Sequence, residues 1–136
     1  MGEGKLNHQS RVLVFLGVGL AAVFIWSLVR PHDYFTWLLE VLPAIIGVGV
    51  LAATYRRFRF STLVYTLICL HAMILMIGGH YTYAEVPLFN WIRDVFGFSR
   101  NHFDRLGHFA QGFVPAMIAR EILLRTTPLR RGKMLF

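Results

Sequence analysis

Long apolar runs constrain this chain more than any other feature. Residues 12–29 form eighteen consecutive positions without a charge, between Arg11 and Arg30. A helix needs about 20 mainly apolar residues to cross the hydrocarbon core of a bilayer. Three further runs have comparable length, so the sequence predicts an all-α, polytopic membrane helix bundle in one domain, residues 1–136. The predicted spans cover residues 12–29, 35–55, 60–77 and 106–124.

The composition excludes an ordinary soluble domain. The chain is 56% hydrophobic and 15% charged, which leaves too little charged surface for a water-soluble protein of 136 residues. Its formal charge of +7 would otherwise indicate nucleic-acid binding, but the basic residues lie in short clusters between the apolar runs. We therefore expect no nucleic-acid partner. Cys69 is the single cysteine, so no disulfide framework is possible within the chain.

The first run has a competing interpretation as a cleaved signal peptide. It is long for one, it contains Trp26, and no small-x-small cleavage pattern follows. We therefore interpret residues 12–29 as an uncleaved first span.

Lysine and arginine predict the orientation. With four spans and a cytoplasmic N-terminus, the outer side carries four of the 14 basic residues, Arg30, Arg93, Arg100 and Arg105. The cytoplasmic side carries the other ten: Lys5, Arg11, Arg56, Arg57, Arg59, Arg120, Arg125, Arg130, Arg131 and Lys133. The positive-inside rule favours this arrangement. It makes the loop of residues 78–105 extracytoplasmic.

That loop contains an amphipathic segment, residues 87–96, PLFNWIRDVF. Its apolar residues recur at helical spacing, and Pro87 suits the first position of a helix. The pattern predicts a short interfacial helix on the outer membrane surface. A lid packed on the spans fits the same pattern.

Polar residues gather where the fourth span begins. Asn101, Asp104, His108 and Gln111 follow one another at intervals of three, four and three residues, so they share one helical face. Ionisable side chains are costly within a bilayer and usually face a partner or a water-filled cavity. This face is therefore a candidate site.

Depth supports a site on the outer side. Glu40 and His71 lie six or seven residues from the outer ends of the second and third predicted spans, which places both about 10 Å below the surface. His80 and Glu85 lie just above them. These positions predict a polar cavity that opens to the extracytoplasmic face.

One hypothesis for this cavity is a metal site. His80, Asp104 and His108 offer the imidazole and carboxylate ligands that suit zinc or another divalent metal. Glu85 or Glu40 would then serve as the general base for a bound water. Structural readings compete with it: Asn101 and Asp104 also fit the capped start of a helix, and His71 also fits a buried histidine bonded to a neighbouring helix.

The blocks GGHYTYAEVPLFNW and RNHFDRLGHFAQGFVPA resemble the YjdF-type family of bacterial inner-membrane proteins, a domain of unknown function. The resemblance covers essentially the whole chain and carries no established activity. It implies the bacterial inner membrane as the location. It also implies that family members continue beyond the equivalent of residue 136 with further spans and acidic motifs, so this chain corresponds to an N-terminal portion.

Two functions follow as hypotheses. The first is a membrane-embedded hydrolase or transferase, with a metal as an option, that acts on a lipid or envelope substrate. The alternative is a non-enzymatic transporter subunit or membrane scaffold, in which the polar residues, Gln111 and His71 among them, hold helices together or pass a small solute. Either function would have the lipid bilayer as partner, with a homo-oligomer or a second membrane protein as a further option.

Overall fold

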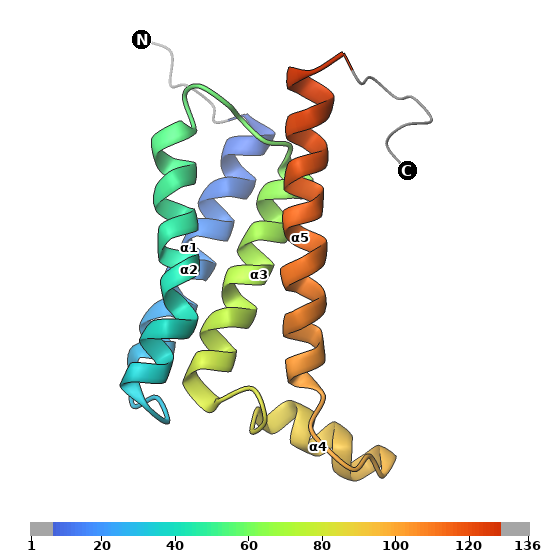
Figure 1. The fold of residues 1–136 in the computed structure, drawn as a ribbon. Helices are drawn as coiled ribbons and strands as arrows, with labels where there is room; N and C mark the ends of the chain where they lie inside the picture. Colours follow the sequence, from blue (N-terminus) through green and yellow to red (C-terminus); the bar gives the residue numbers. More distant parts are fainter. Residues whose placement is uncertain (1–6, 129–136) are drawn as a thin grey trace.

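The computed structural model describes residues 7–128 and is all-helical over that part of the chain (Figure 1). The five helices are α1 (His8–Leu28), α2 (Tyr34–Thr54), α3 (Thr62–Tyr81), α4 (Pro87–Phe96) and α5 (Phe103–Thr126). The predicted all-α class is therefore confirmed. Within the described residues, α1, α2 and α3 are long and apolar enough to cross a membrane.

Polar side chains begin the first three helices. Asn7 accepts a hydrogen bond from the Ser10 amide, and Asp33 accepts one from the Thr36 amide. Ser61 likewise accepts from the Val64 amide at the start of α3. These caps satisfy amide groups that have no partner within the helix, so each start is fixed by local sequence.

The third helix is the centre of the bundle. It packs against α1, α2 and α5, and those three helices surround it (Figure 1). Small or medium side chains allow the close approach, because Cys69, Ala72, Gly78 and Gly79 on α3 are all buried. The largest buried cluster joins α2 to α3 through Trp37, Val41, Ala44, Ala72, Leu75 and Met76.

The predicted end of the third span at residue 77 differs from the structure. Helix α3 continues through Gly78 and Gly79 to Tyr81. Neither glycine ends the helix. Their small size instead allows close packing, of the Tyr83 ring against Gly78 and of Glu40 against Gly79. His71 therefore lies ten residues from the end of α3, about 15 Å along the axis rather than the expected 10 Å.

The two ends of the bundle have different architecture. We call them the Ser61 end, where α1 begins and α5 ends, and the Tyr83 end, where α4 lies crosswise (Figure 1). Pro87 is the first residue of α4, and Gly97 ends it with a φ of 67°. One face of α4 leaves Leu88, Trp91 and Val95 exposed.

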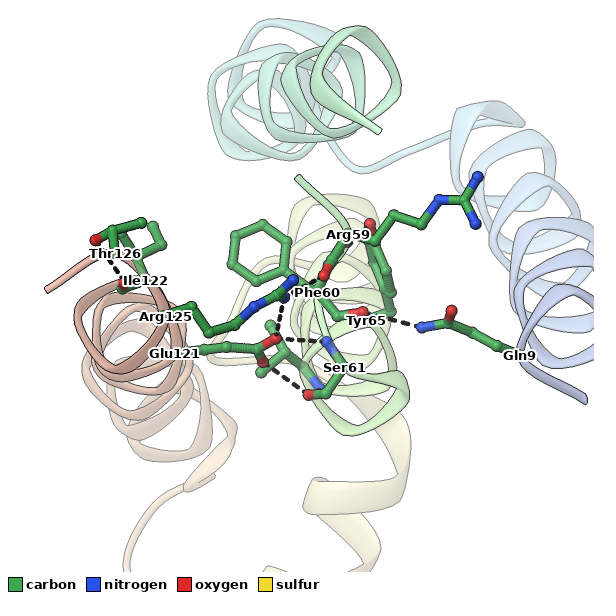
Figure 2. Close-up of polar contacts among 10 residues, drawn as sticks. Gln9, Arg59, Phe60, Ser61, Tyr65, Glu121, Ile122, Arg125 and Thr126 are labelled. Atoms are coloured by element: carbon green, nitrogen blue, oxygen red, sulfur yellow. Dashed lines mark hydrogen bonds and ion pairs between the residues drawn. The ribbon is translucent and has the colours of Figure 1, made fainter. Parts of the chain in front are cut away.

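A network of polar contacts fixes α5 to α3 at the Ser61 end (Figure 2). The Glu121 carboxylate accepts hydrogen bonds from the Ser61 amide and the Ser61 hydroxyl, each at 2.7 Å. Arg125 donates to the same carboxylate at 3.0 Å and also to the Arg59 carbonyl. Its guanidinium lies 4.3 Å from the centre of the Phe58 ring. A carboxylate of one helix thus caps the first turn of another.

Candidate functional site between α2 and α5

A groove runs between α2 and α5 with α3 as its floor. Two adjoining hollows form it, of about 490 and 160 Å³, and both are lined by Gly47 of α2, Ile68 of α3 and Ile118 of α5. The larger hollow lies toward the Ser61 end. It is apolar apart from Thr54 and Thr126, and its other residues are Val50, Leu51, Phe58, Phe60 and Ile122. The half of the groove toward the Ser61 end therefore resembles a channel for a hydrocarbon chain.

The smaller hollow contains a histidine at mid-depth. His71 lies there on α3, between Pro43 of α2 and Pro115 of α5. Its Nε2 atom is buried, and no side chain or backbone group of residues 7–128 hydrogen-bonds to it. An unpaired polar atom inside a membrane helix bundle is costly, which makes His71 a candidate for ligand contact.

Tyr83 packs between α3 and α5 at the Tyr83 end. Its ring packs against Gly78 of α3 and Gly107 of α5, and its centre lies 5.6 Å from that of Phe103. Its hydroxyl is buried without a well-formed hydrogen bond in the described part of the chain. Burial raises the pKa of this phenol, and the nearby negative charge of Glu40 raises it further.

Glu40 is the carboxylate at this end of the groove. It lies on α2 one turn before Ala44, which lines the smaller hollow, and its Cβ faces Gly79 of α3. The structure therefore brings Glu40 and Tyr83 together, and it places His71 deeper in the same groove. The sequence analysis selected Glu40 and His71 but not Tyr83. Gly78 and Gly107, which leave room for the Tyr83 ring, are the sequence signal for it.

The polar face of α5 continues into the wall of the groove. Asp104, His108 and Gln111 are spaced so that they share a helical stripe with Pro115 and Ile118, which line the smaller hollow. Gln111 and His108 are exposed along this stripe. Asp104, His108 and Gln111 thus lie on one helix as predicted, whereas Asn101, the fourth residue of the predicted face, precedes α5.

Asp104 and His108 make local contacts. Asp104 pairs with Arg100 at 2.7 Å and accepts from the Arg105 amide at 2.9 Å. His108 Nδ1 lies 2.8 Å from the Asp104 carbonyl, so an Nδ1–H tautomer donates there and leaves Nε2 exposed. Asp104 lies in the first turn of α5, as expected if it is an acidic residue at the start of a helix.

His80 faces a different helix. Its Nδ1 lies 2.9 Å from the carbonyl oxygen of Ser27 on α1, and its ring is 4.3 Å from that of Trp26. Ser27 also accepts a hydrogen bond from Trp37, so His80 belongs to a contact region shared by α1, α2 and α3. Within residues 7–128 no three His, Cys, Asp or Glu side chains are arranged to hold a metal ion, so the predicted trio is not assembled there.

Asn101 and Glu85 lie in the segment that carries α4. Asn101 is buried, donates to the Val86 carbonyl and to Asn90, and accepts from the Phe103 amide. It therefore ties α4 to the start of α5 and is not part of the groove. Glu85 is exposed and its amide donates to the Thr82 carbonyl.

Comparison with known proteins assigns the chain to a family. The family model described as "Predicted membrane protein (DUF2238)" matches residues 12–136. This chain belongs to that family. It is also 52% identical over 115 residues to the inner membrane protein YjdF of Escherichia coli (strain K12). No solved structure matches the chain.

The aligned part covers 85% of this chain and 55% of the E. coli protein, so the chain spans about half the length of that relative. The family assignment confirms the resemblance seen in the sequence and the expectation of a membrane protein. The three apolar helices are consistent with a multi-pass arrangement in the inner membrane.

Proposed function

We propose that this chain supplies the ligand-holding groove of an inner-membrane hydrolase or transferase that acts on a lipid or envelope molecule. The apolar part of the ligand lies along the larger hollow, and its polar part lies near His71 and Glu40. One observation carries the proposal: the groove is apolar in its half toward the Ser61 end and contains an unpaired imidazole nitrogen at mid-depth.

Glu40 and His71 are the groups that would exchange protons with such a ligand. His71 lines the smaller hollow and Glu40 lies one helical turn from Ala44, which also lines it. A carboxylate and an imidazole can act as general base and general acid. Glu85 lies outside the groove, in the segment before α4, so it is a weaker candidate for the base.

A divalent metal is not used in this proposed chemistry, because His80 faces α1 and the described residues do not gather three ligands. The metal site at His80, Asp104 and His108 stays a prediction. Elemental analysis of purified protein beside Asp104→Ala and His108→Ala tests it: stoichiometric zinc in the parent and none in the folded variants would support it.

Native mass spectrometry tests the groove. The parent protein should retain about one lipid per chain after delipidation in mild detergent. Ile118→Trp fills the groove and should abolish retention. Ile25→Trp is the matched control, because Ile25 is 62% exposed on α1 and lines neither hollow of the groove. Equal lipid retention in the two variants would contradict the proposal.

A second assay tests for chemistry. The purified parent is incubated with a total lipid extract from bacteria, and the products are identified by mass spectrometry. Glu40→Gln should retain the lipid but not convert it, because it keeps the shape of the side chain and removes the base. Unchanged conversion in this variant would remove Glu40 from the mechanism.

The arrangement of the helices also favours the alternative function, a scaffold or transporter subunit. Helices α1, α2 and α5 each pack on α3 and leave grooves between them, and the E. coli relative is nearly twice as long as the aligned part. Under this alternative, a further helix fills the groove. Ile118→Trp would then prevent assembly with that partner, as measured by the mass of the purified complex, whereas no lipid would be retained by the parent.

The membrane topology is part of the proposal. We take α5 as a fourth span, because its 24 residues pack along α3, and α4 as an interfacial helix at the outer surface. The N-terminus is then cytoplasmic. Lys5, Arg130, Arg131 and Lys133, which contribute to this orientation, lie outside the described residues. A reporter fused after Arg131 should be active in the cytoplasm, and an extracytoplasmic signal would overturn the topology.

A further inference from the structure

Tyr83 occupies a slot formed by two helices. A Cβ atom added to Gly78 would lie 2.6 Å from the Tyr83 ring, and one added to Gly107 would lie 2.8 Å from it. Among the described glycines, Gly97 is the one with a positive φ. Gly78 and Gly107 are thus not required by their backbone conformation. They are required because the ring fills the space on both sides.

The residue before the ring is strained. Thr82 has a φ of 64° and a ψ of 147°, a conformation that residues with a side chain rarely adopt. The closed position therefore costs backbone free energy at Thr82.

The slot lies directly above the groove. Glu40, Gly78 and Gly107 are each one to two helical turns from residues that line the smaller hollow, namely Ala44, Leu75 and Val114. The Tyr83 ring, which lies against Gly78 and Gly107, is thus one to two helical turns from that hollow. If the ring leaves the slot, two glycines without side chains remain there.

We propose that Tyr83 is a gate between the outer end of the bundle and the polar half of the α2–α5 groove. In the closed state its ring fills the slot between Gly78 and Gly107. In the open state Thr82 relaxes, Tyr83 leaves, and the polar part of an amphiphilic ligand reaches Glu40 and His71. The identity of the ligand rests on the proposed function, whereas the movement of the ring does not.

The experiment measures access to the groove without any lipid ligand. In a Cys69→Ser background, His71→Cys supplies one thiol, and a charged, water-soluble methanethiosulfonate reagent is present on both sides of reconstituted vesicles. The result is thus independent of orientation. A gate that is open for about 10% of the time or less gives slow labelling with Tyr83 present, and Gly107→Ala should accelerate it about tenfold or more.

Gly112→Ala is the matched control. Gly112 lies on the same helix as Gly107, and a Cβ added there has no neighbouring atom within 4 Å. Its labelling rate should equal that of the parent. Equal rates for Gly107→Ala and the parent would overturn the proposal, as would a parent that is labelled as fast as an exposed thiol.

A second pair of variants applies if Gly107→Ala does not fold. Tyr83→Ala removes the ring without adding a clash and should also accelerate labelling. Tyr81→Ala is its control, because Tyr81 contacts Trp26 and His80 at the end of α3. Slow labelling in folded Tyr83→Ala would show that Tyr83 is a packing residue only. Loss of lipid retention without a change in labelling would instead affect the proposed function alone.

Discussion

Polar groups are fully paired in the network at Ser61 but not in the groove between α2 and α5. At the Ser61 end, the Glu121 carboxylate receives hydrogen bonds from Ser61 and Arg125 (Figure 2). In the smaller hollow of the α2–α5 groove, the Nε2 of His71 is buried without such a partner among residues 7–128. Both regions lie at contacts of α3, so proximity to the core does not explain the difference.

Hydrogen-bond pairing distinguishes polar residues that stabilise the fold from those that are candidates for ligand contact. A hydrogen bond to a charged group contributes to stability, whereas a buried polar group without a partner lowers it. Polar residues kept at a cost are therefore candidates for ligand contact, and fully paired ones are candidates for structure. The predictions below test this division, from the largest expected effect to the smallest.

Glu121→Ala should lower the free energy of unfolding most, by about 3 kcal/mol, because hydrogen bonds to a charged group contribute about 1.5–3 kcal/mol and the Ser61 amide and hydroxyl both lose their acceptor. The measurement is reversible unfolding of the purified protein in detergent. Arg120→Ala is the control, because Arg120 is exposed on the same turn of α5. If both variants were equally stable, the network would be a minor contact.

Gly107→Ala should lower stability by about 2 kcal/mol, the typical cost of extra volume in a packed core. Gly112→Ala should instead raise it by about 0.5 kcal/mol, because alanine favours a helix over glycine. The same unfolding assay compares them. Changes of the same sign in both variants would contradict the close packing of Tyr83.

His80→Leu and His71→Leu compare two histidines of one helix. His80→Leu should cost about 1 kcal/mol, because the hydrogen bond to the Ser27 carbonyl is lost. A shift of the unfolding midpoint to lower temperature is the observation expected. Similar stability of His80→Leu and the parent would indicate that this contact is weak.

His71→Leu should show the smallest change, an unfolding free energy within about 0.5 kcal/mol of the parent or higher, because an apolar side chain replaces an unpaired polar one. Lipid retention should nevertheless fall. A strongly destabilised His71→Leu would mean that the imidazole has a partner in the folded protein, and His71 would then be structural.

Local sequence determined much of the fold. The uncharged run of residues 12–29, the caps Asp33 and Ser61, and the proline–glycine boundaries of α4 are short-range signals, and the corresponding helices form where these signals are. The spacing of Asp104, His108 and Gln111 likewise fixed their common face, because the helical repeat depends on the backbone alone.

Tertiary structure decided which faces meet. His80 and His71 lie on the same helix, but His80 faces α1 and His71 faces the groove. The local sequence does not determine how α3 is rotated about its axis relative to the neighbouring helices. The local sequence does not indicate Ser61 as a partner of Glu121, but Glu121 accepts hydrogen bonds from Ser61, 60 positions away. Gly78 and Gly79 read as a helix end, but tight packing keeps them helical. Helix propensity and hydropathy act along the chain, whereas these roles depend on contacts between distant segments.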